Sequence, residues 1–200
     1  MKCVSCEQLS FKIICNKCQK NLLAPSFHKR ELEKNFYNYS FYSFSEIEDL
    51  ITSKYYFHGD RVFNILAKLS FKKFAQNFDF EEIVYSIGID EHTRHEFSQT
   101  AILSRHLKSK DIKPIFNQLK ATNTVKYAGH DLEYRQKNKR KFKTSLANKK
   151  IILVDDLITT GTTILEAKKT LEKKNNELYS ILSISRYKIG NTSDDDSFKL

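Results

Sequence analysis

Two adjacent carboxylates, Asp155 and Asp156, stand between a run of four apolar residues and a turn rich in threonine and glycine. The segment reads IILVDDLITTGTTILEA over residues 151–167. Four consecutive apolar residues are typical of a parallel strand that is covered on both faces. The turn opens an amphipathic run, and the free N–H groups and the dipole of a helix N-terminus bind anions. The residues of this turn are Thr159, Thr160, Gly161, Thr162 and Thr163.

The two carboxylates need a task of their own, because negative charges beside a phosphate site repel the phosphate. Accepting hydrogen bonds from neighbouring sugar hydroxyls is such a task, and holding Mg²⁺ is another. Ligands of parallel sheets bind beyond the carboxyl ends of the strands, and we expect this strand to end at Val154. The pattern predicts a sugar phosphate, with its diol on the aspartates and its phosphate on the turn. A capped helix beside structural aspartates is the alternative.

Two other phosphate-binding architectures are excluded by missing motifs. A P-loop ATPase needs GxxxxGK[ST], and a dinucleotide-binding domain needs GxGxxG, and the chain contains neither.

All the cysteines of the chain form two CxxC pairs within its first 18 residues: Cys3, Cys6, Cys15 and Cys18. Two such pairs wrap one tetrahedral ion, and four thiolates leave no open position for chemistry. We therefore predict a structural zinc that holds a segment too short to bury a core of its own. A four-thiolate iron–sulfur cluster and a redox-active CxxC pair are the alternatives.

Composition and charge narrow the class of protein. The 200 residues are 40% hydrophobic, enough for a core, and no apolar stretch approaches the roughly 18 residues of a membrane span. The first residues lack the apolar centre of a signal peptide, so we expect a soluble, cytosolic chain. Residues 120–150 hold ten of the Lys and Arg side chains and only two acids. A region this basic favours partners rich in phosphate, and a solvated loop is the alternative.

The remaining chain supplies the elements that must position these residues. Periodicity predicts strands over residues 36–44, 82–87, 112–116, 151–154 and 178–184, and helices over residues 45–52, 60–74, 95–107 and 161–173. The aromatic run FYNYSFYSF of residues 36–44 fits a half-buried strand better than a surface that stacks bases. Strands that alternate with helices predict a parallel α/β sheet with right-handed crossovers.

The segment IILVDDLITTGTT resembles the signature of type I phosphoribosyltransferases, which has four apolar residues, two acidic residues and a Thr/Gly-rich phosphate loop. The wider chain is similar to the ComF (ComFC) competence family, which joins a four-cysteine zinc module to such a domain. Besides the CxxC pairs, the matching residues are Lys54 with Gly59 and Asp60, Arg94 with Phe97 and Gln99, and Arg135 with Asn138 and Phe142. Two segments depart from the family pattern: YSIGID replaces a proline-containing strand, and EFSQ replaces GFNQ.

The resemblance implies a type I phosphoribosyltransferase-like parallel sheet flanked by helices, over residues 36–190. A four-cysteine zinc-finger module would precede it over residues 1–35, and a polar, disordered tail would follow over residues 191–200. The implied ligand is phosphoribosyl pyrophosphate or a related ribose 5-phosphate, bound with Mg²⁺. Asp155 and Asp156 would take the ribose hydroxyls, and residues 159–163 the 5′-phosphate.

The pyrophosphate contacts implied by the resemblance are Lys54, Gly88, Ile89, Asp90 and Arg94. The basic stretch would be the loop that closes over the pyrophosphate in such enzymes. Arg135 in this stretch joins Asp155 and Asp156 as a candidate catalytic residue.

The resemblance also implies a function, which is to assist the uptake of transforming single-stranded DNA into the cytoplasm. DNA would be bound by Lys137, Lys139, Arg140, Lys141 and Lys143. A competence helicase or an inner-membrane DNA channel would be the protein partner, which places the chain in the cytoplasm or at the inner face of the cytoplasmic membrane. The alternatives are a phosphoribosyltransferase with an unidentified base or nucleic-acid acceptor, and a sensor that binds the ligand without turnover.

Overall fold

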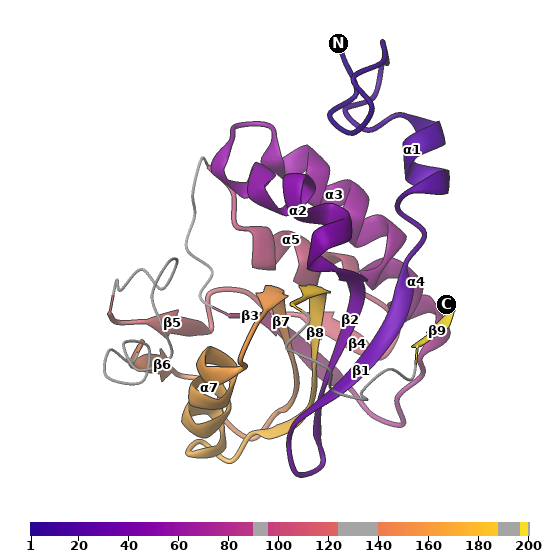
Figure 1. The fold of residues 1–200 in the computed structure, drawn as a ribbon. Helices are drawn as coiled ribbons and strands as arrows, with labels where there is room; N and C mark the ends of the chain where they lie inside the picture. The colour runs from indigo at the N-terminus through magenta and orange to yellow at the C-terminus, as the bar shows by residue number, and fades with distance from the viewer. Residues whose placement is uncertain (90–95, 124–139, 188–196, 200) are drawn as a thin grey trace.

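The centre of the molecule is a seven-stranded sheet with the strand order β4-β3-β7-β8-β2-β1-β9 (Figure 1). The computed structural model describes residues 1–89, 96–123, 140–187 and 197–199. The five strands from β4 to β2 are mutually parallel, and β1 and β9 add an antiparallel edge. The strands are β1 (Ser26–Glu33), β2 (Phe36–Ser43), β3 (Val84–Gly88), β4 (Ile112–Pro114), β7 (Lys150–Ile158), β8 (Glu177–Arg186) and β9 (Ser197–Lys199). The predicted α/β fold class with a parallel sheet is confirmed.

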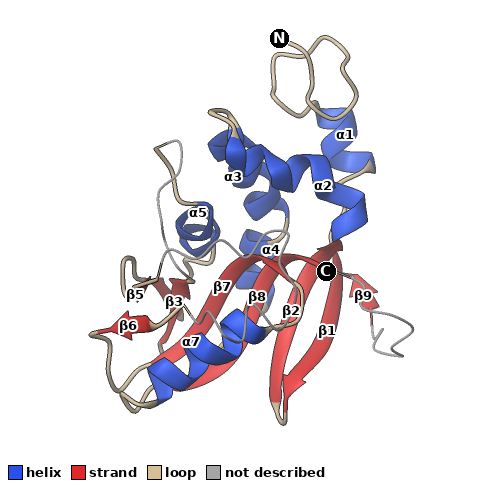
Figure 2. Ribbon diagram, turned by 60° about the vertical axis from the view of Figure 1, so that its left-hand side comes forward, coloured by secondary structure: helices blue, strands red, loops and turns tan. Residues whose placement is uncertain are grey.

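Helices cover both faces of this sheet (Figure 2). One face carries α2 (Phe44–Thr52), α3 (Gly59–Leu69), α4 (Phe71–Asn77) and α5 (Gln99–His106), and the other carries α7 (Thr162–Glu172). The side chains of β7 alternate between the two layers: Ile152 and Val154 pack with α2–α5, whereas Ile151 and Leu153 pack with α7. This alternation explains the four consecutive apolar residues, because each face of the strand is buried.

The helix predicted over residues 60–74 is two helices, α3 and α4, that meet at Ser70. The backbone of Ser70, with φ −114° and ψ −75°, departs from regular α-helical angles, and its hydroxyl donates to the carbonyl of Leu66 at 2.7 Å. The break turns Phe71 and Phe74 into the sheet, where the ring centroids of Phe41 and Phe71 lie 5.1 Å apart. Ring packing with β2 therefore overrides the regular helical periodicity.

The aromatic run of residues 36–44 forms β2 and then enters α2. Phe41 and Tyr42 are buried, and Phe41 packs against Phe27 of the neighbouring strand β1 with ring centroids 5.7 Å apart. The rings belong to the core, in agreement with the prediction of a half-buried strand.

The N-terminal cysteine region joins the core on the side of the sheet that carries α2–α5. It contains α1 (Asn16–Asn21), and its buried residues Cys3, Ile14 and Cys18 join the same hydrophobic cluster as α2–α5. β1 forms a hairpin with β2, so the predicted boundary after residue 35 falls in the hairpin turn. At the other end of the chain, β9 lies inside the segment predicted as a disordered tail and pairs with residues 26–28 of β1.

Two short elements complete the described chain. The 3₁₀ helix η1 (Ser53–Tyr55) follows α2, and β5 (Leu119–Ala121) pairs with β6 (Phe142–Thr144) in a separate two-stranded sheet. Over the residues that the structure describes, no helix combines the length and the apolar character needed to cross a membrane.

Candidate functional site

Asp155 and Asp156 lie inside β7, and the expectation that this strand ends at Val154 is wrong. β7 continues to Ile158 because β8 continues beside it, with Leu157 opposite Ser185. Consecutive strand residues point to opposite faces, so Asp156 lies on the α2–α5 side and Asp155 on the α7 side. Each carboxylate also accepts a hydrogen bond from the next backbone N–H group, at 2.9 Å.

Asp156 has a cationic partner in Lys54 of η1. The Lys54 Nζ atom lies 2.7 Å from Asp156 Oδ2, and the two side chains are only 18% and 9% exposed. Burial opposes the charge of Lys54, but the attraction of Asp156 outweighs it and raises the pKa of Lys54 above its ordinary value. Lys54 therefore carries its positive charge at neutral pH.

Gly59 fixes the position of Lys54. A Cβ atom at this residue would lie 2.3 Å from the carbonyl oxygen of Ser53 and 2.7 Å from the ring of Phe97. Glycine thus lets the start of α3 pack directly on η1, and any other residue would push the Lys54 turn away from Asp156.

Asp155 is in a different electrostatic environment. Burial and the neighbouring charge of Asp156 raise the pKa of Asp155 well above its ordinary value, and Lys54 offsets only part of this shift. A carboxylate in this position gains from groups that donate hydrogen bonds to it, such as ligand hydroxyls, or from a cation.

The turn after β7 has the geometry of an anion site. Gly161 adopts a left-handed backbone with φ 80° and immediately precedes α7. Gly161 has no side chain to cap the helix, and the N–H groups of a first helical turn are suited to binding an anion. Within the turn, the N–H of Thr162 donates to the Thr160 hydroxyl at 3.5 Å. The hydroxyls of Thr160 and Thr162 lie 2.9 Å apart on the exposed side of the turn. Arg30 of β1 supports the turn by donating from Nη2 to the carbonyl oxygen of Thr159 at 2.8 Å.

The end of β3 lies directly beside the aspartates. Gly88 is the register partner of Val154, and the backbone N–H of Ile89 donates to the carbonyl of Val154 at 2.9 Å. The structure therefore brings Lys54, Gly88 and Ile89 to the edge of the sheet that also carries the aspartates and residues 159–163. Asp90 and Arg94 lie outside the described residues.

The basic segment is described only at its two ends, β5 and β6 with their flanking residues. Lys120 and Lys143 are exposed register partners across these strands, and like charges directly opposite each other are unfavourable unless an anion lies between them. The backbone N–H groups of Arg140 and Lys141 donate to the Glu166 carboxylate of α7 at 3.0 and 2.7 Å. Arg135, Lys137 and Lys139 lie outside the described residues.

The four cysteines form a second candidate site. Their Sγ atoms lie within 4.8 Å of one another, and those of Cys6 and Cys15 are 3.8 Å apart. A tetrahedral zinc with Zn–S bonds of about 2.3 Å separates its sulfurs by roughly the same 3.8 Å, so the donor set fits the ion. The backbone N–H of Cys15 points to Cys3 Sγ at 3.3 Å, and that of Cys18 to Cys15 Sγ at 3.4 Å. Both contacts stabilise thiolates.

The cysteine thiols differ in how easily they lose a proton. Burial of Cys3 opposes ionisation, but backbone hydrogen bonds from Cys15, Ser5 and Cys6 outweigh it and lower the pKa of Cys3 to about 6. Burial and then the neighbouring thiols Cys15 and Cys6 raise the pKa of Cys18. A cluster that ionises its first thiol easily and its last with difficulty requires a cation to hold all four as thiolates.

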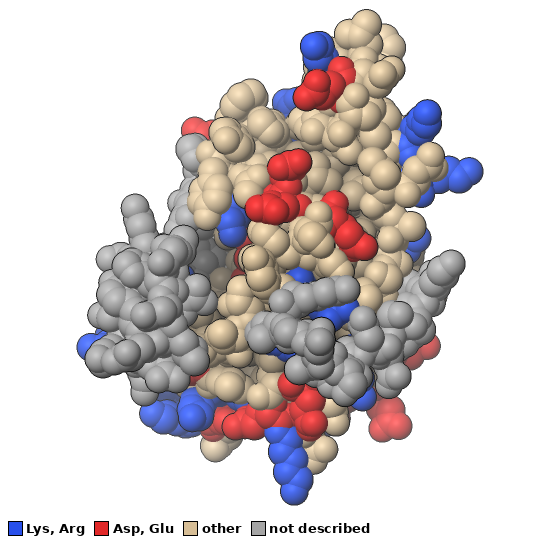
Figure 3. Space-filling view, viewed as in Figure 1, with Lys and Arg blue, Asp and Glu red and all other residues tan. Residues whose placement is uncertain are grey.

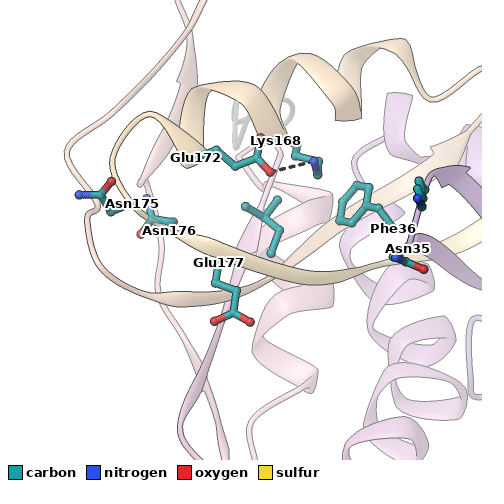
Figure 4. Close-up of a pocket in the computed structure, with 9 residues that line it drawn as sticks. Asn35, Phe36, Lys168, Glu172, Asn175, Asn176 and Glu177 are labelled. Atoms are coloured by element: carbon teal, nitrogen blue, oxygen red, sulfur yellow. Dashed lines mark ion pairs between the residues drawn. The ribbon is translucent and has the colours of Figure 1, made fainter.

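A cleft of about 450 Å³ lies elsewhere, between the end of α7, the start of β8 and the β1–β2 turn (Figure 4). Its lining includes Lys168, which pairs with Glu33 and Glu172 at 2.8 Å each. The cleft is at the amino end of β8, whereas Asp155 is the register partner of Ser183 in the other half of that strand. The positive charge of Lys168 is already paired with these two carboxylates, so we do not assign the phosphate-binding site to this cleft.

Three supporting residues were not predicted from the sequence. Arg30 holds the turn, Leu32 packs 3.2 Å from where a Cβ of residue 161 would lie, and Glu166 fastens the basic segment to α7. Arg30 and Glu166 act on backbone atoms of segments distant in sequence, and such contacts leave no motif.

The match to a known family covers the second half of the chain. The model of the phosphoribosyl transferase domain matches residues 102–196, which contain the last part of α5 and all of β7, the turn, α7 and β8. Together with the observed sheet, this match defines a phosphoribosyltransferase-like α/β fold. A comparison with curated protein sequences gave no significant match.

Solved structures of this class are similar to the chain at low sequence identity. An adenine phosphoribosyltransferase is 15% identical over 84% of this chain and 88% of its own, with a TM-score of 0.38. Orotate phosphoribosyltransferase from Mycobacterium tuberculosis H37Rv is 11% identical over 85% of this chain and 82% of its own, with a TM-score of 0.39. Leishmania donovani UMP synthase is 14% identical over 70% of this chain, with a TM-score of 0.38, and the chain spans only 24% of its length.

Proposed function

We propose that this protein binds phosphoribosyl pyrophosphate, together with Mg²⁺, at the edge of the sheet where β3 and β7 end. The observation that carries the proposal is the single strand–turn–helix unit in which Asp155 and Asp156 lead into the Gly161 turn and α7. One end of this unit accepts hydroxyl groups and the other donates to an anion. A ribose 5-phosphate has both kinds of group, joined at the distance of one sugar ring.

Each part of the ligand has a proposed set of contacts. The 5′-phosphate binds residues 159–163, and the ribose hydroxyls donate to Asp155 and Asp156. The pyrophosphate lies beside Gly88 and Ile89, with Asp90 and Arg94 following in the chain. Lys54 neutralises Asp156 at 2.7 Å and so lowers the repulsion between this carboxylate and an anionic ligand.

The site fits Mg²⁺ only in company with the ligand. Among the described residues, the cysteines form the one group of three or more potential metal-binding side chains, so the aspartates do not make a closed cage for the ion. Mg²⁺ keeps several waters and binds through substrate phosphates with one or two carboxylates, and here Asp155 or Asp156 can supply one. When bound, the ion would neutralise charge on the departing pyrophosphate.

Transfer of the phosphoribosyl group is the proposed reaction if the protein turns over. A lone pair of the acceptor forms a bond to the anomeric carbon while the bond from that carbon to the pyrophosphate oxygen breaks, and pyrophosphate leaves with the electron pair. Asp155 and Asp156 orient the ribose for this displacement. Arg135 in the basic segment is proposed to stabilise the leaving group.

Single-stranded DNA is the second proposed ligand, and the unfavourable pairing of Lys120 with Lys143 supports it. A phosphate between these side chains would relieve their repulsion. Arg140 and Lys141, which directly precede β6, add further positive charge beside this pair. The resemblance to the ComF family favours a role in DNA uptake, with a competence helicase or an inner-membrane DNA channel as partner. The proposed zinc at the four cysteines would hold the N-terminal region in place.

Titration calorimetry with phosphoribosyl pyrophosphate and Mg²⁺ tests the first proposal. We expect the wild type to bind, and Asp155→Ala and Asp156→Ala to lose at least about tenfold in affinity through lost charge-assisted hydrogen bonds. Asp79→Ala is the matched control, because Asp79 is an exposed carboxylate whose pair with Lys110 lies on the surface. A wild-type protein that does not bind the ligand contradicts the proposal.

Release of pyrophosphate separates the transferase from the sensor. The protein is incubated with the ligand, Mg²⁺ and either candidate bases or single-stranded DNA, and free pyrophosphate is measured. Release that depends on the acceptor and disappears in Asp156→Asn indicates transfer. Binding without release indicates a sensor.

DNA binding is tested by the salt dependence of affinity for a labelled single-stranded oligonucleotide. Each phosphate contact contributes about 0.7 to the slope of log K against log salt. We expect Lys143→Gln to reduce the slope, and Lys110→Gln, an exposed lysine paired with Asp79, to leave it unchanged. Transformation assays with Asp156→Ala would then connect the ligand site with DNA uptake.

A further inference from the structure

Three consecutive aromatic side chains lie exposed between α2 and α3. Tyr55 is 46% exposed, Tyr56 58% and Phe57 83%. Single exposed apolar side chains are common, whereas a contiguous group indicates an interaction site. We refer to residues 54–58 as the aromatic loop.

The backbone of the aromatic loop is held in a fixed turn. The N–H of Tyr56 donates to the carbonyl of Ser53 at 2.9 Å, and the N–H of Gly59 donates to the carbonyl of Tyr56 at 3.0 Å. The Ser53 hydroxyl donates to the carbonyl of Leu50 at 2.6 Å, which ties the turn to α2. The rings are therefore presented by an ordered segment, and little conformational entropy is lost when a ligand packs on them.

Neighbouring side chains also order the rings. Tyr56 stacks on His58 with centroids 5.7 Å apart and planes only 3° apart, and Phe57 meets His58 edge-on at 5.2 Å. Lys54 Nζ lies 5.4 Å from the centroid of Tyr55. Because stacking and edge contacts hold the rings at fixed angles, a further planar ring can add to the group by the same interaction.

The aromatic loop begins at the proposed ribose site. Its first residue, Lys54, contacts Asp156 at 2.7 Å, so Tyr55 is one residue away from a side chain of that site. Figure 1 shows that the arrowheads of β7 and β8 point toward the layer of α2, α3 and α5, which carries the loop. A planar group stacked on the loop would therefore lie next to the ribose.

The charged side chains around the aromatic loop are unevenly distributed, which determines where a chain of phosphates could lie. The exposed Arg61 follows the aromatic loop closely in the chain, whereas α2 exposes Glu46, Glu48 and Asp49. Figure 3 shows acidic side chains gathered over α2. Phosphates are repelled from this acidic side and attracted to the side with Arg61.

We propose that the aromatic loop stacks unpaired bases of single-stranded nucleic acid at the rim of the ribose site. Every base has a π-face, and rows of aromatic side chains beside cations are the usual means of binding single strands without sequence preference. A duplex does not expose its base faces, so the loop selects unpaired strands. The inference rests on the proposed function, since it assigns the single-stranded ligand to a position beside the ligand of Asp155 and Asp156.

The test compares a labelled oligothymidylate with an abasic oligonucleotide of the same length, by fluorescence anisotropy at one low salt concentration. Both strands carry the same phosphates, so their difference in affinity measures base contacts. We expect the wild type to prefer the strand with bases. Phe57→Leu and Tyr56→Leu should each lower affinity for this strand roughly tenfold and leave abasic binding unchanged.

Tyr179→Leu is the matched control. Tyr179 is 36% exposed and lies at the start of β8, at the opposite end of the sheet from the aromatic loop. This variant should keep the preference of the wild type. Because Tyr56 and Phe57 project into solvent, their substitution by leucine should leave the thermal unfolding midpoint unchanged, which is measured on the same samples.

Several outcomes would overturn the inference. They are equal affinity of the wild type for the two strands, equal affinity for a duplex, or competition by a free mononucleotide as effective as that by the oligonucleotide. A Phe57→Leu and Tyr56→Leu double variant with full base preference would overturn it as well, and would leave a protein partner as the occupant of the loop. Binding of phosphoribosyl pyrophosphate is measured separately. A protein that binds this ligand but shows no preference for the strand with bases contradicts only the base-stacking inference. A protein that shows the preference but does not bind phosphoribosyl pyrophosphate contradicts only the proposal of that ligand.

Discussion

The four-cysteine cluster and the aspartate edge of the sheet are both candidate binding sites, but they are built in opposite ways. The cluster takes every donor from 16 consecutive residues, and its four sulfurs surround one point. The aspartate edge combines η1, the end of β3 and the continuous unit of β7 and the Gly161 turn, three segments that lie far apart in the sequence. We call the first the closed site, because its four sulfurs surround the position that an ion would take, and the second the open site, because its residues lie along an edge of the sheet and do not enclose one point.

This difference indicates what each site contributes. A closed four-thiolate site has no position for a substrate, so its binding energy stabilises the fold. At the open site, the raised pKa of Asp155 shows a carboxylate whose surroundings disfavour its charge. Groups that reduce stability in this way are characteristic of binding sites, where a ligand supplies the missing partner.

Removing a ligand of the closed site should have the largest effect. We expect Cys18→Ser to abolish bound metal and to lower the free energy of unfolding by roughly 3 kcal/mol or more. Cys18 is buried in the same cluster as Phe27 and Phe41, so loosening the N-terminal region also exposes core surface. Metal content by atomic emission and unfolding in denaturant measure the two effects.

The control for this change is Leu9→Ser, because Leu9 belongs to the same region and is exposed. It should retain metal and stability. If purified wild-type protein carries iron in place of zinc, the iron–sulfur alternative holds. A Cys18→Ser protein as stable as wild type would show that the cysteine cluster does not stabilise the fold, which would contradict the role we assign to the closed site.

Breaking the buried ion pair between Lys54 and Asp156 should have the next largest effect. Lys54→Met leaves the charge of Asp156 buried without its partner, and Asp156→Asn does the same to Lys54. Such losses cost about 3–5 kcal/mol in a fully buried pair, and the partial exposure of Lys54 reduces our expectation to about 2 kcal/mol.

A double-mutant cycle isolates the pair. Lys54→Met with Asp156→Asn should recover part of the stability lost in each single variant, because neither charge is then left alone. Unfolding in urea provides the free energies of unfolding of the wild type, the two single variants and the double variant. Strict additivity of the single effects would mean that the pair is not coupled and that Lys54 is held by its turn alone.

The same contrast explains how much of the molecule was predictable. The cysteine cluster and the strand–turn–helix unit are local, so spacing alone located the cysteines, Gly161 and the aspartates. The partner of Asp156 is 102 residues away, and the pairing depends on the close packing that Gly59 allows. The continuation of β7 to Ile158 depends on its neighbour β8, and the break at Ser70 depends on core rings. These features arise from tertiary contacts, which no periodicity encodes.

Replacing Asp155 should raise stability while it removes binding. In the unfolded chain this carboxyl ionises near its ordinary pKa of 3.8, and in the folded protein its pKa is raised. Below pH 3.8 the group is protonated in both states. As the pH rises through 3.8 toward the folded value, the free energy of unfolding falls, by about 1.4 kcal/mol for each unit by which the pKa is raised.

Asp155→Asn cannot ionise, so it should be more stable than wild type at pH 7 and equal to it at the lowest pH. Urea unfolding of both proteins across this pH range measures the difference. The variant should also bind phosphoribosyl pyrophosphate more weakly. Lower stability of Asp155→Asn at neutral pH would contradict the interpretation that the Asp155 carboxylate destabilises the fold and is retained for ligand binding.

The smallest effect is expected at the contact that joins the basic segment to the open site. Glu166→Ala removes the acceptor of the Arg140 and Lys141 N–H groups, at a cost of about 1 kcal/mol because these groups can bond to water instead. Strand β6, which carries Lys143, is then less firmly held on α7, and the affinity for single-stranded DNA should fall a few fold. Glu172→Ala, on the same helix, removes only a surface pair with Lys168 and is the control. If both variants bind DNA equally, the basic segment acts independently of α7, and the open site consists of the sheet edge and its turn alone.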